Sequence, residues 1–126
     1  MTSESVGGLR VIRSNERVPD TTPTTGMTRE HAIAHDGLWA GVVRTEPGMV
    51  SGWHHHGEHE TTIYVAEGTL RMESAEGATD ALAGDFIHVP PRRVHRESNP
   101  GDAPSVAVFS RFGEGPVTVN VEGPNG

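Results

Sequence analysis

The sequence predicts an all-β fold, a sandwich or small barrel of short strands. Val (14) and Ile (4) taken together far outnumber Leu (4), and β-branched residues favour the pleated surface of a sheet over a helix. Gly (16) and Pro (9) divide the 126-residue chain into short segments, and turn motifs such as NPGD and GEGP lie between them. Many short strands with regular breaks are typical of a single β domain of this length.

Nine strands follow one another between the turn motifs, each identified by a run of β-forming residues. They span residues 38–45, 50–56, 61–66, 69–74, 78–82, 86–89, 94–98, 105–112 and 117–121. The apolar residues expected to form the core include Ile63, Val65, Phe86, Val89, Val106 and Val108. Residues 28–35 carry a weak helical pattern, which predicts a single turn of helix.

These strands define one β domain flanked by two polar segments. A turn-rich N-terminal arm covers residues 1–30, the barrel covers residues 31–121, and residues 122–126 form a frayed tail. A small barrel leaves strand edges exposed, and the segment LRVIRS in the arm suits an added strand on a neighbouring subunit. We therefore expect a homodimer, the commonest closed assembly, in which this arm is exchanged.

Composition excludes several classes of function. The chain has no Cys and its ten basic residues are all Arg, which rules out thiolate chemistry, disulfides and lysine Schiff bases. A net charge of −7 argues against nucleic acid as a partner. The sequence has no apolar run long enough to span a membrane, and its first residues lack the apolar stretch of a signal peptide. We expect a cytoplasmic protein with no membrane partner.

The most informative motif is the histidine run WHHHGEHE. His54 and His56 are two residues apart on an expected strand, so their imidazoles share one face while His55 points to the other. His95 comes from a later strand, and Glu97 lies on the same face two residues further on. Three imidazoles and a carboxylate on neighbouring strands suit a divalent transition metal with positions open to a substrate.

Simpler interpretations exist for these polar residues. A pair of histidines on a strand is often a surface or packing feature, and a solvated HHH loop can bind Ni or Zn adventitiously. The basic cluster Arg92, Arg93 and Arg96 suits either a substrate carboxylate or surface pairs with glutamates. We treat His31, His35 and His88 as ordinary histidines.

A longer pattern resembles the two motifs of the cupin superfamily. GMVSGWHHHGEHETTIYVAEG, from Gly48 to Gly68, is similar to the first motif, and GDFIHVPPRRVHRESN, from Gly84 to Asn99, is similar to the second. The resemblance covers roughly residues 38–112. It implies a double-stranded β-helix, also called a jelly roll or cupin barrel, with metal ligands inside the barrel mouth.

The chain departs from the family pattern at two positions. The usual ligand glutamate of the first motif falls on Thr61, which is a poor ligand for a divalent ion, and Arg92 replaces a glycine of the second motif. The end of the first motif resembles the pirin branch of cupins, whose carboxylate ligand follows the second-motif histidine by two residues, and this implies Glu97 as the fourth ligand. The alternatives are Glu60, through a local bulge, or a three-histidine site completed by water.

This combination predicts a metal-binding cupin that is a metal-dependent enzyme for a small oxygenated metabolite. Iron or copper would favour dioxygenase chemistry, which is the activity we expect, whereas manganese, nickel or zinc would favour a Lewis-acid isomerase or lyase. A non-catalytic cupin that binds a small molecule is the alternative, because one fold hosts many functions.

Overall fold

Strands form nearly all of the regular structure in a computed structural model that describes residues 4–22 and 24–126. Residues 1–3 and 23, which belong to the predicted arm, lie outside the described residues. The strands are β1 (Glu4–Val6), β2 (Leu9–Val11), β3 (Val18–Asp20), β4 (Met27–His35), β5 (Leu38–Thr45), β6 (His54–His55), β7 (Glu60–Glu67), β8 (Thr69–Ser74), β9 (Gly77–Leu82), β10 (Phe86–Val89), β11 (Arg96–Ser98), β12 (Ser105–Phe112) and β13 (Val119–Asn120). A 3-10 turn, η1 (Ser14–Glu16), precedes β3.

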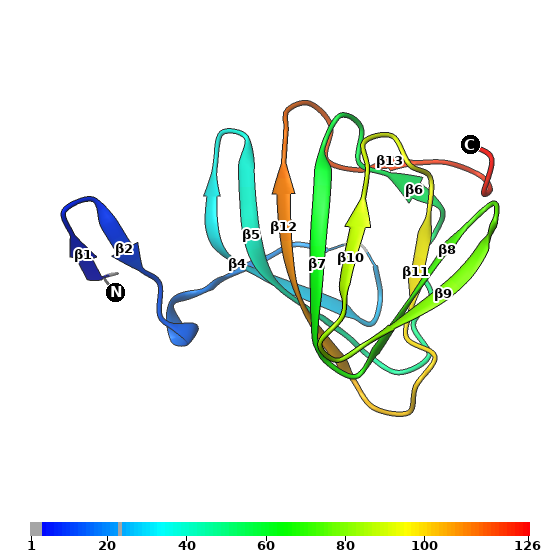
Figure 1. The fold of residues 1–126 in the computed structure, drawn as a ribbon, viewed down its shortest axis with the longest axis horizontal. Coiled ribbons are helices and arrows are strands. Elements are labelled where there is room, and N and C mark those ends of the chain that lie inside the picture. Colours follow the sequence, from blue (N-terminus) through cyan, green and yellow to red (C-terminus); the bar gives the residue numbers. More distant parts are fainter. Residues whose placement is uncertain (1–3, 23) are drawn as a thin grey trace.

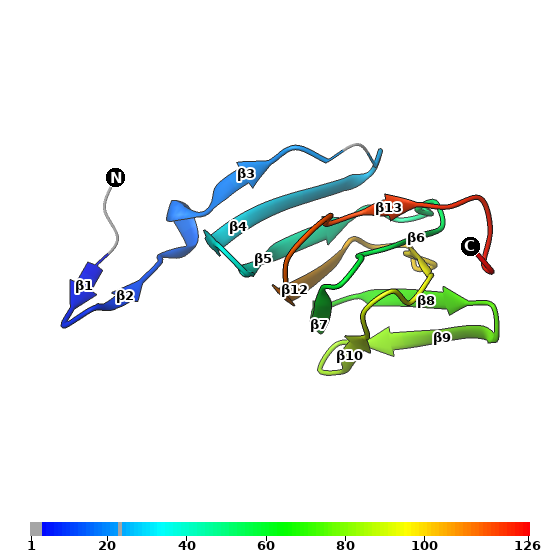
Figure 2. The same cartoon turned by 90° about the horizontal axis from the view of Figure 1, so that it is seen from above.

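Two facing layers of antiparallel strands form the barrel (Figure 1). A six-stranded sheet has the order β10-β7-β12-β5-β4-β3, a three-stranded sheet has the order β11-β8-β9, and the short β6 pairs with β13. Figure 2 shows the long sheet curving along one side, with β8, β9 and the β6–β13 pair on the other side. This arrangement is the double-stranded β-helix, so the predicted all-β fold class is confirmed.

The hydrophobic core lies between the two layers. Its buried apolar residues are Met27, Val43, Met49, Ile63, Val65, Leu70, Met72, Ala81, Val89, Ala107 and Phe109. The expected core positions Ile63, Val65 and Val89 are confirmed. On β7 and β12 the inward faces then continue beyond the core with polar side chains, Thr61 and Arg111, which are also buried. The barrel interior is therefore apolar along part of its length and polar next to it.

Two predicted segments differ from the observed strands. Residues 28–35 belong to strand β4, not to a turn of helix, and β4 pairs along β5 with a register shift between His31 and Ile33. The strand predicted over residues 50–56 is reduced to β6, with Val50 in an isolated bridge to Ser98. Between this bridge and the bridge of His54 to His95, the Ser51 amide donates to Glu97 O at 2.8 Å, so the segment follows β11 without forming a continuous strand.

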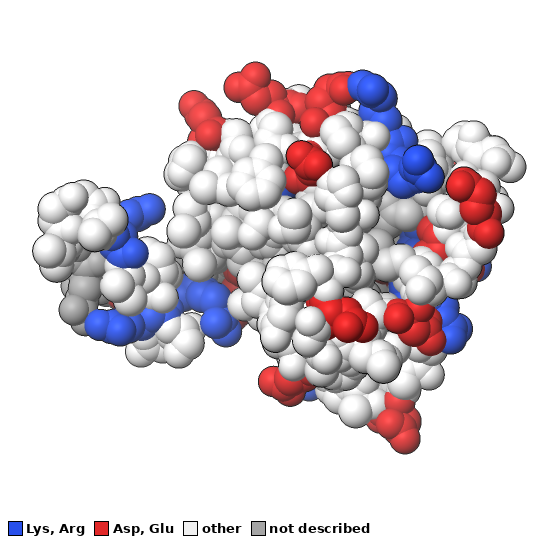
Figure 3. Space-filling view, viewed as in Figure 1, with Lys and Arg blue, Asp and Glu red and all other residues white. Residues whose placement is uncertain are grey.

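Two valines and one phenylalanine expected in the core lie elsewhere. Phe86 is 76% exposed, Val108 is 41% exposed and Val106 is half-buried. On β12 the inward residues are Ala107 and Phe109 instead, and a shift of one residue exchanges the two faces of a strand. The outer face of the long sheet is consequently rich in uncharged side chains, with acidic groups along its rim (Figure 3).

The predicted N-terminal arm consists of two different parts. The β1–β2 hairpin stands apart from the barrel, whereas β3 and β4 join the six-stranded sheet, so the sheet continues across the predicted boundary at residue 30. Val6, Leu9 and Val11 of the hairpin are 76%, 75% and 49% exposed. The homodimer with an exchanged arm stays a prediction, and these exposed apolar side chains suit it.

No helix in the described ranges is long and apolar enough to cross a membrane. The helical segment found there, η1, has three residues. The cytoplasmic location, and the expected lack of nucleic-acid and membrane partners, stay predictions.

Candidate metal centre

Two segments that are far apart in the sequence bring three histidines together. His54 lies in β6 and His95 immediately precedes β11, and their backbones exchange two hydrogen bonds, each 2.9 Å from N to O. On its other side β6 pairs with β13. His56 follows His54 by two residues in extended backbone, which returns its side chain to the same face. The backbone alone therefore fixes where all three imidazoles start.

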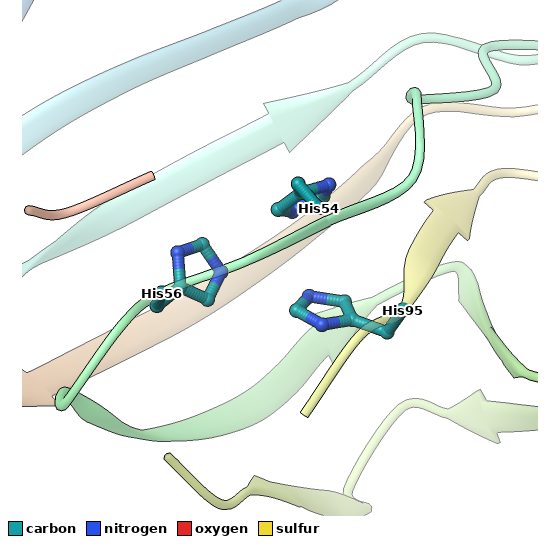
Figure 4. A group of neighbouring side chains, drawn as sticks. All are labelled: His54, His56 and His95. Atoms are coloured by element: carbon teal, nitrogen blue, oxygen red, sulfur yellow. The ribbon is translucent and has the colours of Figure 1, made fainter. Parts of the chain in front are cut away.

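The three imidazoles point toward one another (Figure 4). Their ring centroids are 5.0 Å apart for His54 and His56, 4.5 Å for His54 and His95, and 5.2 Å for His56 and His95. One nitrogen of each ring lies within 4.8 Å of the other two, and all three residues are buried. His55 does not belong to this group, and its Nδ1 accepts a bond from the Gly57 amide at 3.0 Å.

Backbone carbonyls determine which nitrogen each imidazole offers. The three bonds are donated by Nδ1 of His54 to Gly52 O at 2.8 Å, by Nδ1 of His56 to Val117 O at 2.7 Å, and by Nδ1 of His95 to Arg93 O at 2.9 Å. Because a carbonyl only accepts, each Nδ1 carries the proton and the Nε2 of a neutral ring keeps a lone pair. Metal-binding histidines are oriented by bonds of this kind, so the donor set fits a metal ion.

Burial favours the neutral, ligating form of two of these rings, those of His56 and His95. It lowers the pKa of His56 from its usual 6.5 to about 3, and the nearby Arg111 cation acts in the same direction. Burial also lowers the pKa of His95, against the opposing charge of Glu97. Neutral imidazole binds a metal without first losing a proton, so the site suits a cation at neutral pH.

The two candidate carboxylates lie in different places. Glu97 is 5% exposed in β11 and lines a cavity of about 350 Å³ together with His54 and His56. Its oxygens are not among the donor atoms that lie within 4.8 Å of one another in the described chain. Glu60 begins β7 on the outer face, where its Oε2 accepts a bond from His88 Nε2 at 2.5 Å. The structure therefore brings Glu97, and not Glu60, to the cavity.

The arginine cluster predicted near the mouth is engaged at the surface. Its ion pairs join Arg92 to Glu58, Arg93 to Glu76 at 3.9 Å, and Arg96 to Glu73 at 2.9 Å. Arg92 adopts a φ of 60°, the left-handed region that the glycine of the family motif enters at lower cost, and its amide donates to Gly57 O at 2.8 Å. Surface pairing is thus the interpretation that the structure supports.

Sequence reasoning missed several polar residues of the cavity wall. Arg29 of β4 and Arg111 of β12 line the cavity beside the histidines and also a neighbouring cavity of about 390 Å³. In the second cavity Asp20 accepts bonds from His31 Nδ1 at 2.8 Å and from Trp39 Nε1 at 3.1 Å. Every second side chain of a strand lies on the same face. Applied from the buried first residue of β4, this rule would have placed Arg29 and His31 on one inward face.

A double-stranded β-helix with inward histidines at its mouth defines a class of proteins, and comparison with known proteins agrees with it. The family model described as "Cupin domain" matches residues 41–110, more than half of the chain, and the chain belongs to this family. No curated protein matches the sequence significantly.

Three solved structures with the same fold, all from bacteria, carry different names. One is a sugar phosphate isomerase of the cupin superfamily from Silicibacter pomeroyi (TM-score 0.66, 24% identity, covering 78% of this chain and 70% of that one). Another is an uncharacterized protein with a double-stranded β-helix domain from Klebsiella pneumoniae (TM-score 0.73, 21% identity, covering 91% of this chain and 99% of that one). A third is the polyketide cyclase RemF from Streptomyces resistomycificus (TM-score 0.77, 17% identity, covering 90% of this chain and 85% of that one). At these identities the likeness concerns the fold.

Proposed function

We propose that the protein is a metal-dependent enzyme that acts on a small oxygenated metabolite. The observation that carries this proposal is the set of three buried imidazoles whose Nδ1 protons are bound by backbone carbonyls, which leaves three Nε2 lone pairs close together. We propose Glu97 as the fourth ligand. Its burial in the same cavity and its effect on the pKa of His95, which opposes the larger effect of burial, support this role.

The ion would be held by His54, His56 and His95, with Glu97 beside them. Imidazole and carboxylate ligands suit Fe, Mn, Ni, Zn or Cu. When bound, such an ion supplies Lewis acidity, and a redox-active ion adds reactivity toward dioxygen. The protein contributes the buried surroundings, because charges inside a cavity with little water interact more strongly than they do in solvent.

Lewis-acid isomerase or lyase chemistry is the version we propose. Asp20 accepts a hydrogen bond from Nδ1–H of His31, which leaves the Nε2 lone pair of that ring to take a proton from a substrate. His31 lines the cavity that shares Arg29 and Arg111 with the metal cavity. Isomerisation and elimination both need a proton-transfer group of this kind. A dioxygenase is the second candidate, because three imidazole ligands with positions left open also suit Fe(II).

Proton exchange provides a test that needs no knowledge of the natural substrate. The metal-free protein is reloaded with Mn²⁺, Ni²⁺, Zn²⁺ or anaerobic Fe²⁺ and incubated in D₂O with small hydroxy ketones, 2-hydroxy acids and 2-oxo acids. We expect NMR to show metal-dependent exchange of a proton next to the carbonyl group with no oxygen present, and the loss of that exchange in His56→Ala. Oxygen consumption without exchange would favour the dioxygenase, and metal binding with neither activity would favour a non-catalytic binding cupin.

A further inference from the structure

Two arginines line the cavity beside the histidine cluster. Arg29 comes from β4 and Arg111 from β12, and the cavity of about 350 Å³ that they line also contains His54 and His56. Arg111 is 3% exposed and Arg29 is half-buried. Burial, together with the nearby Arg29 cation, lowers the pKa of Arg111 only to about 10, so Arg111 remains charged at neutral pH. The cavity wall carries two positive charges.

Neither of these guanidinium groups forms an ion pair with a carboxylate in residues 4–22 and 24–126. An exposed arginine such as Arg44 does, with Glu46 at 2.9 Å. The Nε of Arg29 is buried without a hydrogen-bond partner, and the Nε of Arg111 makes one long bond of 3.4 Å to the Thr61 hydroxyl. Buried charges and unpaired donors are costly, so these groups are suited to an anion that comes from outside the chain.

The surrounding residues hold the two guanidinium groups without neutralising them. Both lie over the indole of Trp39, at 6.0 Å for Arg29 and 5.9 Å for Arg111 from the ring centroid. One Nη of Arg29 also donates to the sulfur of Met27 at 3.8 Å. Glu97 is the acidic side chain among the residues lining this cavity, and its charge partly opposes the effect of burial on the pKa of Arg111. The carboxylate of the neighbouring cavity, Asp20, accepts bonds from His31 and Trp39, so within the metal cavity one carboxylate stands against two cations.

We propose that Arg29 and Arg111 form a subsite for the carboxylate group of the substrate. A guanidinium group can donate two parallel hydrogen bonds to one carboxylate. Two arginines and Glu97 together leave a net positive charge, which a monoanion would neutralise. The arginines and the histidine cluster line one cavity, so a hydroxy or oxo group next to that carboxylate can reach the metal ligands at the same time. This inference rests on the proposed function and narrows the metabolite to a small 2-hydroxy or 2-oxo acid.

Calorimetric titration with lactate and lactamide tests the subsite, because the two molecules have nearly the same shape and only lactate is charged. We expect zinc-loaded wild-type protein to bind lactate at least about tenfold more tightly than lactamide, the typical effect of a charged hydrogen bond. Arg29→Gln should remove this preference and Arg29→Lys should keep part of it. Arg44→Gln, on the outer surface, should keep all of it.

Three results would overturn the subsite: equal affinity of the wild-type protein for lactate and lactamide, no binding of lactate, or an undiminished preference for lactate in Arg29→Gln. Tighter binding of inorganic phosphate than of lactate would also overturn the assignment, in favour of a phosphate ester. Circular dichroism on each variant shows that it is folded, and Arg111→Gln gives a second, independent variant of the same subsite.

Metal content measured on the same samples separates this inference from the proposed function. If the wild-type protein holds a metal ion but does not prefer lactate, the arginine subsite is wrong and the metal-dependent function stands. If the protein takes up no metal and still prefers lactate in a way that depends on Arg29, the proposed function is wrong and the anion subsite stands.

Discussion

Acid should lower the free energy of unfolding of the metal-free protein because of His56, and the size of the effect follows from the surroundings of that side chain. In the folded protein burial, aided by the Arg111 cation, lowers the pKa of this imidazole from 6.5 to about 3. Below about pH 6.5 the unfolded chain therefore takes up a proton that the folded chain does not, and unfolding becomes easier by about 1.4 kcal/mol per pH unit. Between about pH 7.5 and pH 4 the expected loss from His56 is about 3 kcal/mol.

Urea unfolding at several pH values, with a chelator present, measures this loss. His56→Gln should show a smaller fall in the free energy of unfolding than the wild-type protein, with a residual slope from His95, whose pKa is also lowered by burial. His55→Gln is the matched control, because that half-buried ring lies outside the cluster. Equal pH slopes in His56→Gln and the wild-type protein would refute the reasoning.

Three further changes have expected outcomes. Glu97→Gln should weaken metal affinity by about tenfold or more in a competition titration, and Glu60→Gln should not, whereas equal effects would contradict the fourth-ligand assignment. Gly41→Ala should lower the free energy of unfolding by about 1–3 kcal/mol or more, because its Cβ would lie 2.2 Å from the Glu30 carbonyl oxygen; a stable variant in urea would count against the close packing of β4 and β5. Removing residues 1–13 should turn the expected homodimer into a monomer in size-exclusion chromatography, and an unchanged elution volume would argue against the exchanged arm.

The histidine cluster was predictable because its geometry depends on little more than extended backbone. His54 and His56 share a face through the period of two, even though β6 itself contains two residues and not the predicted seven. The backbone bridge between His54 and His95 could not be read from the sequence, since it depends on which strands cross at the barrel mouth. The family motifs supplied that pairing.

The two cavity arginines were missed for a physical reason. Both faces of β12 carry apolar side chains, with Val106 and Val108 on one face and Ala107 and Phe109 on the other. Hydrophobicity alone therefore does not identify the inward face. The burial of Arg111 settles the question. In β4 the inward residues near the site are polar, which removes the alternation that normally identifies a strand and explains the mistaken turn of helix. In a strand that lines a polar cavity, the alternation of apolar and polar residues therefore does not reveal the strand or its inward face.

The most direct test of the account is the metal content of untagged protein by plasma mass spectrometry, with wild type beside His56→Ala and Glu97→Gln. We expect about one equivalent of a transition metal in the wild-type protein, almost none in His56→Ala and a reduced amount in Glu97→Gln. The identity of the metal would then distinguish oxygen chemistry from Lewis-acid chemistry. A wild-type protein that holds no metal, even after reconstitution with iron, manganese, nickel, zinc or copper, would contradict the central claim that the three histidines form a metal centre.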